Sequence, residues 1–239
     1  MMRRQTEINY EMKLLSSLEK VFQDETPVYR PECLVLSALW DETVSFQAAY
    51  TGDCFMRERL EARVVSELEK WVRVRTVEQV PVGRATNVIV DDNYLKTTPG
   101  MYPDLLRDLP EDHKVIVCSH QWRSLWVDVE VTEEIPAGDY EIEIQLLKEG
   151  EIVCSAKMKL HVVGVTLPKQ EIMHTEWMHA DCLADYYHVE VFSEEHWQIL
   201  ENFFAEYVKR GGNMMLVPCL PPLWIRLWGW SGPRPSLWM

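Results

Sequence analysis

The stretch "EEIPAGDYEIEIQLLKEGEIVCSAKMKLHV" (residues 133–162) shows most directly how this chain folds. Apolar and polar side chains alternate on both sides of the glycine-containing turn "KEGE" (148–151). Alternation with a period of two places one face of a strand against a core and the other face in water. Two such runs joined by a short turn indicate a hairpin, so this stretch predicts antiparallel β-structure.

Similar runs occupy most of the first two thirds of the sequence. They alternate apolar with polar residues or are rich in β-branched residues, and turn signals such as "IPAGD" separate the later ones. Several short alternating strands in succession are typical of two packed antiparallel sheets, so we predict a β-sandwich over residues 1–166. Residues 12–22 fit a strand or a helix by pattern, and a strand is favoured. The other expected strands are 42–50, 73–80, 114–118, 124–131, 139–147 and 155–165.

The pattern changes after "LPKQ" (167–170). Residues 171–178 are a short strand candidate, and "SEEHWQILENFFAEYVKRGG" (193–212) predicts a helix that is capped by its first serine and stopped by its glycines. The wholly apolar run "NMMLVP" (213–218) is typical of a parallel strand, so the order predicts one right-handed β/α/β unit. A single unit cannot bury its own apolar faces, so we expect part of them to be exposed in this chain. The apolar stripe of the predicted helix is one such face, and we interpret it as core rather than as a ligand site. It comprises Trp197, Leu200, Phe203, Phe204, Tyr207 and Val208.

Composition and charge narrow the class of protein. Hydrophobic residues make up 47% and charged residues 26%, and no apolar run is long enough to cross a bilayer. The net charge of -14 argues against nucleic acid and against anionic membrane surfaces as partners, because both attract clustered basic residues. The N-terminus lacks the apolar segment of a secretory signal, and the six scattered cysteines fit free thiols in a reducing compartment. We therefore expect a cytoplasmic protein, and its oligomeric state stays open.

Two sets of motifs carry a family resemblance. The first set is "LPKQ", the W-x-H-x-D-C-x-A-D-Y-Y run of residues 177–187, and "VFSEEHW" (191–197). With these motifs, residues 167–222 resemble the opening of the catalytic domain of glycoside hydrolase family 123, which includes exo-acting β-N-acetylgalactosaminidases. The second set, "LWDETVSFQAAY" (39–50) and "QWRSLWVDVEV" (121–131), resembles the β-sandwich that precedes the barrel in this family. The resemblance implies that residues 167–223 are the first β/α/β unit of a (β/α)8 barrel.

The resemblance also implies an activity, namely hydrolysis of β-linked N-acetylhexosamine such as N-acetylgalactosamine. The family uses substrate-assisted catalysis, in which the sugar's acetamido oxygen attacks the anomeric carbon and a Glu beside an orienting carboxylate acts as acid and base. This adjacent Asp-Glu pair lies on a later barrel strand in the family. We therefore assign no catalytic residue, expect no cofactor, and expect the chain alone to be inactive. The alternative is a non-catalytic carbohydrate-binding or structural β-sandwich module.

Three residues are candidates for substrate binding. Trp177, His179 and Asp181 fall where the first barrel strand would end, and active sites of such barrels lie at that end of the strands. We expect them to contact the sugar, with packing against neighbouring loops as the alternative. Trp122 and Trp126 are candidates for a carbohydrate platform, although a place in the sandwich core is favoured for both.

Two other features have simpler interpretations. The adjacent pair Asp41-Glu42 opens an expected strand, so we interpret it as a solvated strand start and not as a catalytic pair. No metal site is expected, because the histidines and the cysteine near residue 180 lack the tight spacing of structural zinc ligands. The residues considered for a metal are His174, His179, Cys182 and His188.

The last residues, "WIRLWGWSGPRPSLWM" (224–239), contain no carboxylate although the chain as a whole is acidic. Trp and Met each have one codon, so a shifted reading frame can be partly reconstructed. That frame gives Asp across Trp224-Ile225, Gly across Trp228-Gly229 and Asp across Trp238-Met239, a pattern similar to that of the family. We therefore expect frameshifted, non-native sequence here rather than an interfacial anchor, which would need a helical moment.

Overall fold

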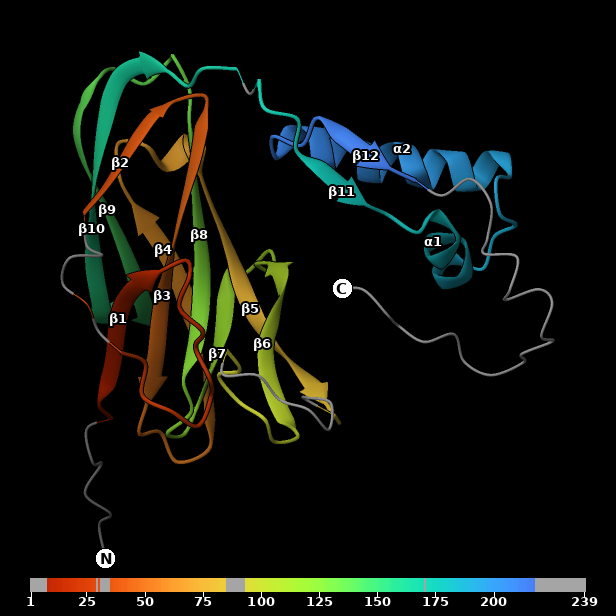
Figure 1. Cartoon of the computed structure of the whole chain (residues 1–239). Helices are drawn as coiled ribbons and strands as arrows, with labels where there is room; N and C mark the ends of the chain where they lie inside the picture. Colours follow the sequence, from red (N-terminus) through yellow and green to blue (C-terminus); the bar gives the residue numbers. More distant parts are fainter. Residues whose placement is uncertain (1–7, 29, 31–34, 85–92, 170, 218–239) are drawn as a thin grey trace, which may run out of the picture. The chain divides into compact units, whose positions relative to one another are not determined.

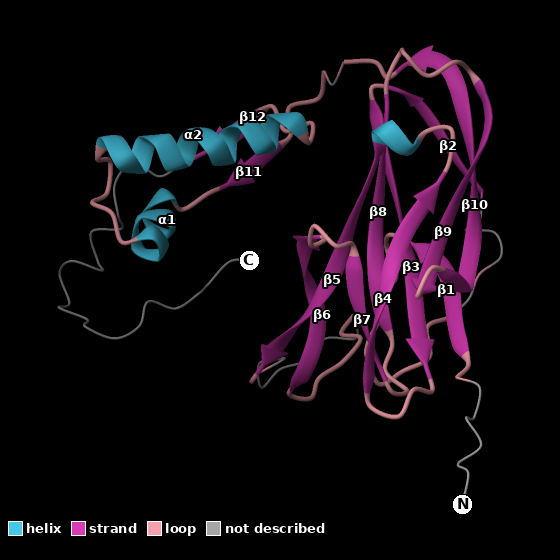
Figure 2. Cartoon of the chain, turned by 180° about the vertical axis from the view of Figure 1, so that it is seen from behind, coloured by secondary structure: helices cyan, strands magenta, loops and turns pink. Residues whose placement is uncertain are grey.

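The computed structural model describes residues 8–28, 30, 35–84, 93–169 and 171–217 (Figure 1). The chain divides into two compact units, Met1–Leu167 and Pro168–Met239. The described residues are mostly β-sheet, and the α-helices lie in the second unit (Figure 2). The segment 224–239, for which a frameshift is expected, lies outside the described residues.

Strands make up most of the first unit. All six strands predicted without ambiguity are present, and the segment with two possible patterns contributes a strand over its first part. In chain order the elements are β1 (Tyr10–Ser16), β2 (Val35–Trp40), β3 (Glu42–Gly52), β4 (Arg57–Val65), a 3₁₀ helix (Glu69–Trp71), β5 (Val72–Val82), β6 (Gly100–Asp108), β7 (Lys114–Cys118), β8 (Arg123–Val131), β9 (Gly138–Lys148) and β10 (Glu151–Thr166).

These strands form two five-stranded sheets (Figure 1). One sheet has the order β1-β3-β8-β5-β6, and the other has the order β2-β10-β9-β4-β7. The predicted hairpin is present as β9 and β10, which pair antiparallel from Glu151 opposite Lys148 to Val162 opposite Gly138. Among the described strands of this unit, β10 and β2 are the parallel pair.

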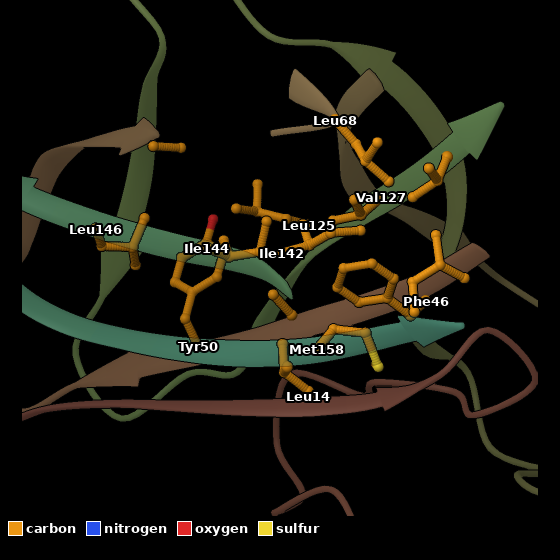
Figure 3. Packing of buried hydrophobic residues seen from close by; sticks show 14 of the residues in the cluster. Leu14, Phe46, Tyr50, Leu68, Leu125, Val127, Ile142, Ile144, Leu146 and Met158 are labelled. Carbon is orange, nitrogen blue, oxygen red and sulfur yellow. The ribbon is translucent and has the colours of Figure 1, made fainter. Parts of the chain in front are cut away.

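One hydrophobic core takes side chains from both sheets (Figure 3). Phe46 and Leu125 come from the first sheet and Ile144 and Met158 from the second, and each is at most 1% exposed. Along β8 the buried apolar residues recur at every second position, as the sequence alternation requires. Burial of one such side chain stabilises the fold by about 1.5–3 kcal/mol, so this core is the main stabilising feature of the unit.

The second unit contains the predicted β/α/β order. Strands β11 (Thr175–Trp177) and β12 (Met214–Leu216) pair in parallel, and α2 (Glu194–Lys209) lies between them in the sequence. The sequence did not predict a further helix, α1 (Ala180–Tyr187). Its N-cap residue forms no side-chain cap bond, so the usual start signal is missing.

Helix α2 begins and ends as predicted. The Ser193 hydroxyl accepts a hydrogen bond from the backbone N–H of His196 at 3.2 Å, and Gly211 has a φ of +87° just beyond the end of the helix. The expected exposure of apolar side chains is confirmed for part of the stripe and for β12. Leu200 is 1% exposed, but the exposed fractions are 49% for Trp197, 43% for Phe203, 65% for Val208, 40% for Met214 and 45% for Leu216.

Candidate functional site

The carboxyl end of β11 carries the first predicted site residue. Trp177 is the last residue of β11, lies opposite Leu216 of β12, and is 73% exposed. The backbone N–H of Met178 donates to the Leu216 carbonyl at 3.0 Å, so the pairing continues one residue further. Because β11 and β12 are parallel, their carboxyl ends meet at one edge of the pair, and the indole of Trp177 is open to solvent at this edge.

The other two predicted site residues lie in the sequence directly after β11. His179 is the N-cap of α1 and Asp181 lies in the first turn of that helix, where the helix dipole favours a carboxylate. The His179 Nδ1 and Asp181 Oδ1 atoms are 4.0 Å apart. The structure therefore places His179 and Asp181 side by side, just after the strand that ends at Trp177. Their role in sugar binding stays a prediction.

A buried histidine fixes the start of α1. His196 is fully buried, its Nδ1 accepts a hydrogen bond from the Phe192 N–H at 2.9 Å, and its Nε2 lies 2.9 Å from the Ala180 carbonyl. Nδ1 is an acceptor here, so the ring is neutral with its proton on Nε2, which donates to Ala180. This side chain ties α2 to the first residue of α1, and hence positions the turn that carries Asp181. Sequence reasoning missed it, although a histidine four residues before the buried Leu200 marks the buried face of the helix.

The amino ends of β11 and β12 are held by a different network. Asn213 accepts from the His174 N–H at 2.8 Å and donates to the Ile172 carbonyl at 2.9 Å. The Tyr207 hydroxyl lies 3.0 Å from the His174 carbonyl and 2.9 Å from the Met214 carbonyl. Side chains at this end bind backbone groups of the unit itself, whereas the carboxyl end presents an exposed aromatic ring. This asymmetry favours the carboxyl end as the functional one.

The tryptophans of the first unit have structural surroundings. Trp122 is 5% exposed and belongs to a second, smaller cluster that also contains Leu15, Val21 and Ala49. Its burial agrees with the core interpretation, although it lies outside the main core. Trp126 is half-buried, and its Nε1 donates to Asp128 at 2.7 Å.

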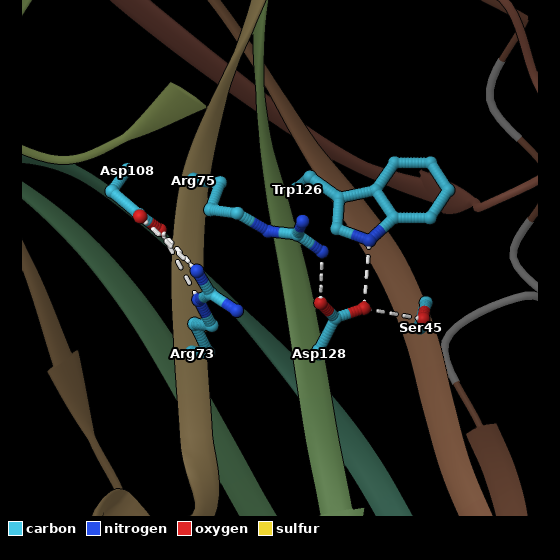
Figure 4. Close-up of polar contacts among 6 residues, drawn as sticks. All are labelled: Ser45, Arg73, Arg75, Asp108, Trp126 and Asp128. Carbon is cyan, nitrogen blue, oxygen red and sulfur yellow. Dashed lines mark hydrogen bonds and ion pairs between the residues drawn. The ribbon is translucent and has the colours of Figure 1, made fainter. Parts of the chain in front are cut away.

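Asp128 joins three strands of one sheet (Figure 4). This carboxylate is 8% exposed and accepts hydrogen bonds from Ser45 Oγ at 2.6 Å, from Trp126 Nε1 and from Arg75 Nη2. A buried charge with this many donors is satisfied without a ligand. The geometry therefore favours a structural role for Trp126 over a sugar platform.

The remaining candidates are explained by local structure. Asp41 has a φ of +66° and donates its N–H to the Val131 carbonyl at 2.7 Å, where the chain passes from β2 in one sheet to β3 in the other. Glu42 is half-buried and accepts from the Leu39 N–H at 2.9 Å, so it is not the fully solvated residue that we expected. Within the described ranges, no group of three or more His, Cys, Asp or Glu residues is placed to hold a metal ion.

The first unit also contains a cavity of about 550 Å³. It lies between β4 and β5, with Val64 and Val74 among its apolar lining residues and Arg63, Arg73 and Asp108 among its charged ones. Its volume lies within the range of small-ligand pockets, roughly 300–1,000 Å³. Sequence patterns alone could not have located it, because its walls come from strands of both sheets.

Comparisons with known proteins point to one family. Residues 177–230 match the family model described as "Glycoside hydrolase 123, catalytic domain", and no curated protein matches the sequence. A solved family 123 glycoside hydrolase from Clostridium perfringens, studied for glycolipid glycan hydrolysis, is similar in structure with a TM-score of 0.61 and 14% identity. The similarity covers 87% of this chain and 37% of that chain, so the present chain spans little more than a third of that enzyme's length.

Two other solved structures are much less similar. The N-terminal domain of PorA has a TM-score of 0.31 at 8% identity, covering 65% of this chain and 99% of that one. A β-glucosidase from Listeria innocua in complex with isofagomine has a TM-score of 0.30 at 9% identity, covering 67% of this chain and 17% of that one. Such scores carry no argument about fold or function. The matched segment and the fold shared with the Clostridium enzyme therefore make this chain similar to glycoside hydrolase family 123.

Proposed function

We propose that this chain is the amino-terminal part of a family 123-type glycosidase that acts on β-linked N-acetylhexosamine. In this proposal residues 1–166 are the β-sandwich that precedes the barrel, and residues 167–223 are the first β/α/β unit of a (β/α)8 barrel. The two five-stranded sheets with a common core support the first assignment. The parallel pairing of β11 with β12 supports the second.

The observation that carries the proposal is the start of the family match at Trp177. In this structure that residue ends β11 with its ring exposed, and the next polar side chains, His179 and Asp181, lie beside each other. An exposed indole offers a flat apolar face to a pyranose ring, while an imidazole and a carboxylate can hydrogen-bond to its hydroxyl groups. These three residues would orient the sugar, and proton transfer would come from elsewhere.

The acid and base groups belong, in this proposal, to a later barrel strand. The family's adjacent Asp-Glu pair has no counterpart within residues 167–223. In the first unit, the Glu42 carboxylate of the pair Asp41-Glu42 accepts a hydrogen bond from the Leu39 N–H. We therefore propose that the 239-residue chain alone does not hydrolyse glycosides. We also retain the proposal that residues 224–239 are frameshifted. Sequencing the gene tests it, since a correct reading frame through this segment with no barrel sequence in the shifted frame would remove it.

Two versions of the protein test whether the missing barrel strands supply the catalytic groups. One is the 239-residue chain, and the other is a version extended by restoring the reading frame after residue 223. Both are assayed on aryl β-N-acetylgalactosaminide and on the glucosaminide. Turnover by the extended version alone supports the proposal, and the preferred sugar identifies the substrate. Turnover by the 239-residue chain would contradict the placement of the acid and base groups.

A second candidate function is carbohydrate binding by the first unit without catalysis. The cavity of about 550 Å³ between β4 and β5 favours it, because charged and apolar side chains line the same space. Saturable binding of N-acetylhexosamines by both versions, with turnover by neither, would support this function. Loss of that binding on Arg73→Gln, which changes a lining residue, would locate it.

We also propose a cytoplasmic location. The support is the wide spacing of the six cysteines in the sequence, which favours free thiols in a reducing compartment. Among the described residues, no helix has the length and apolar character needed to span a membrane. Fractionation of cells that express the protein tests the location, and recovery outside the cytoplasm would contradict it.

A further inference from the structure

A second cavity in the first unit has an unusual charge. It has a volume of about 320 Å³ and is lined by four basic side chains, Arg59, Arg107, Lys114 and Arg123. The acidic residues on its wall are Glu78 and Asp108. A net positive cavity stands out in a chain whose net charge is -14. Like charges brought together repel one another, so the arrangement is costly unless an anion offsets it.

The innermost of these cations is Arg123. It lies on β8 directly opposite Tyr50 of β3, and Tyr50 is 2% exposed. Arg123 has the same parity along β8 as the core residues Leu125 and Val127, so its side chain leaves the strand on the face that packs against the other sheet. Arg123 is half-buried, whereas Arg107 and Lys114 are exposed at the outer part of the cavity.

One donor of the Arg123 guanidinium lacks a partner in the described part of the chain. The Arg123 Nε atom is buried, and no acceptor in the described part of the chain lies within hydrogen-bond distance of it. A buried donor without an acceptor loses its hydration without replacement, which is costly for a charged group. The neighbouring Tyr50 hydroxyl does not help, since it donates to the Ile116 carbonyl at 3.3 Å. Burial raises the pKa of Tyr50, so it supplies no negative charge.

The two carboxylates on the wall have other partners. Asp108 accepts two hydrogen bonds from Arg73 Nη2, at 2.8 and 3.1 Å (Figure 4). Glu78 accepts from the Thr76 hydroxyl at 2.9 Å. Arg59 lies 3.8 Å from Asp112, at the limit of an ion pair. In the described ranges, the other three cations of the cavity form no ion pair, so their charge is available to a ligand.

We propose that this cavity binds the oxyanion group of a small ligand, a carboxylate, sulfate or phosphate ester, with Arg123 as its inner donor. Guanidinium groups bind such oxyanions through a fork of parallel N–H bonds. Arg107 and Lys114 then neutralise the outer part of the bound group. All lining residues of this cavity belong to the first unit, so the proposal does not rest on the sugar site that the proposed function places at β11.

Titration of the 239-residue chain with small anions tests this directly. Sodium sulfate, sodium phosphate and sodium glucuronate are titrated by calorimetry against sodium chloride at equal ionic strength. The expected result is saturable binding of at least one of them at one site per chain. Comparison of the three titrations shows which oxyanion the cavity binds most tightly. Heats that follow ionic strength alone, with no saturation for any of the three, would overturn the proposal.

Variants locate the site. Arg123→Gln should weaken binding at least tenfold, whereas Arg57→Gln, which removes an exposed charge that does not line the cavity, should leave the affinity within twofold. Circular dichroism checks that each variant is folded. If Arg123→Gln does not fold, the double change Arg107→Gln and Lys114→Gln alters exposed side chains only, and should still weaken binding severalfold. Equal affinities in these variants and in Arg57→Gln would overturn the proposal.

Discussion

The two ion pairs of β5 allow a sharp test of the first unit (Figure 4). The Arg75 and Asp128 side chains are 14% and 11% exposed, whereas those of Arg73 and Asp108 are 59% and 68% exposed. Removing one partner of a buried pair leaves an uncompensated charge and costs about 3–5 kcal/mol. An exposed pair contributes at most about 1 kcal/mol. We therefore expect Asp128→Ala to destabilise the protein by about 3–5 kcal/mol, and Asp108→Ala by less than about 1 kcal/mol.

The assay is urea unfolding of the full chain, followed by far-UV circular dichroism in chloride buffer. Asp128→Asn is an informative intermediate, because its amide oxygen can still accept from the Trp126 indole while the charge is lost. The loss of unfolding free energy for Asp128→Asn should lie between the losses for Asp128→Ala and Asp108→Ala. If Asp128→Ala were no more destabilising than Asp108→Ala, Asp128 would not be the structural link between three strands. Trp126 would then again be a candidate for a sugar platform.

Further predictions concern other parts of the chain. Gly212→Ala should destabilise the second unit by about 1–3 kcal/mol in urea unfolding, because the new Cβ would lie 2.2 Å from the Tyr207 ring, and an unchanged midpoint would contradict this. Hydrogen bonding from Ser155 holds the pKa of Glu143 below its usual 4.5, so its contribution to stability is present above that pH and is lost as the pH falls through the folded-state pKa. Ser155→Ala should therefore reduce the loss of stability on acidification, and an identical pH profile would argue against it. Burial raises the pKa of Cys154 to about 11, so iodoacetamide at pH 8 should label this thiol only after unfolding. Peptide mapping distinguishes it from the exposed Cys182, and rapid labelling of Cys154 in the folded chain would count against its burial.

Strands with alternating apolar and polar residues were predictable, because successive side chains of a half-buried strand point alternately to the core and to water. Strand β4 was missed, since "RERLEARVV" is rich in residues that favour helices, and its strand form depends on pairing with β7 and β9. Strand β6 contains Pro103, which weakens a strand pattern and is tolerated here because β6 is an edge strand. Both cases show tertiary pairing overriding local preference.

The candidate site residues also differ in how far the sequence alone could locate them. Trp177 could be placed at the end of a strand because the β/α/β order and the family motif both fix that position. The burial of Arg123 could not be predicted, because it depends on Tyr50 and on residues of the opposite sheet that are distant in sequence. The spacing of His196 from Leu200 could have indicated its burial, but its two partners could not be predicted because they are backbone groups.

The central claim is that the carboxyl end of β11 is part of a sugar-binding edge, and the kcat/KM of Trp177→Ala tests it most directly. The measurement uses the extended, frame-restored protein with the aryl N-acetylhexosaminide that it prefers, and Phe55→Ala serves as control because that side chain is 95% exposed in the first unit. We predict at least a tenfold loss of kcat/KM for Trp177→Ala and less than a twofold change for the control. Equal kcat/KM values for the two variants would contradict the account.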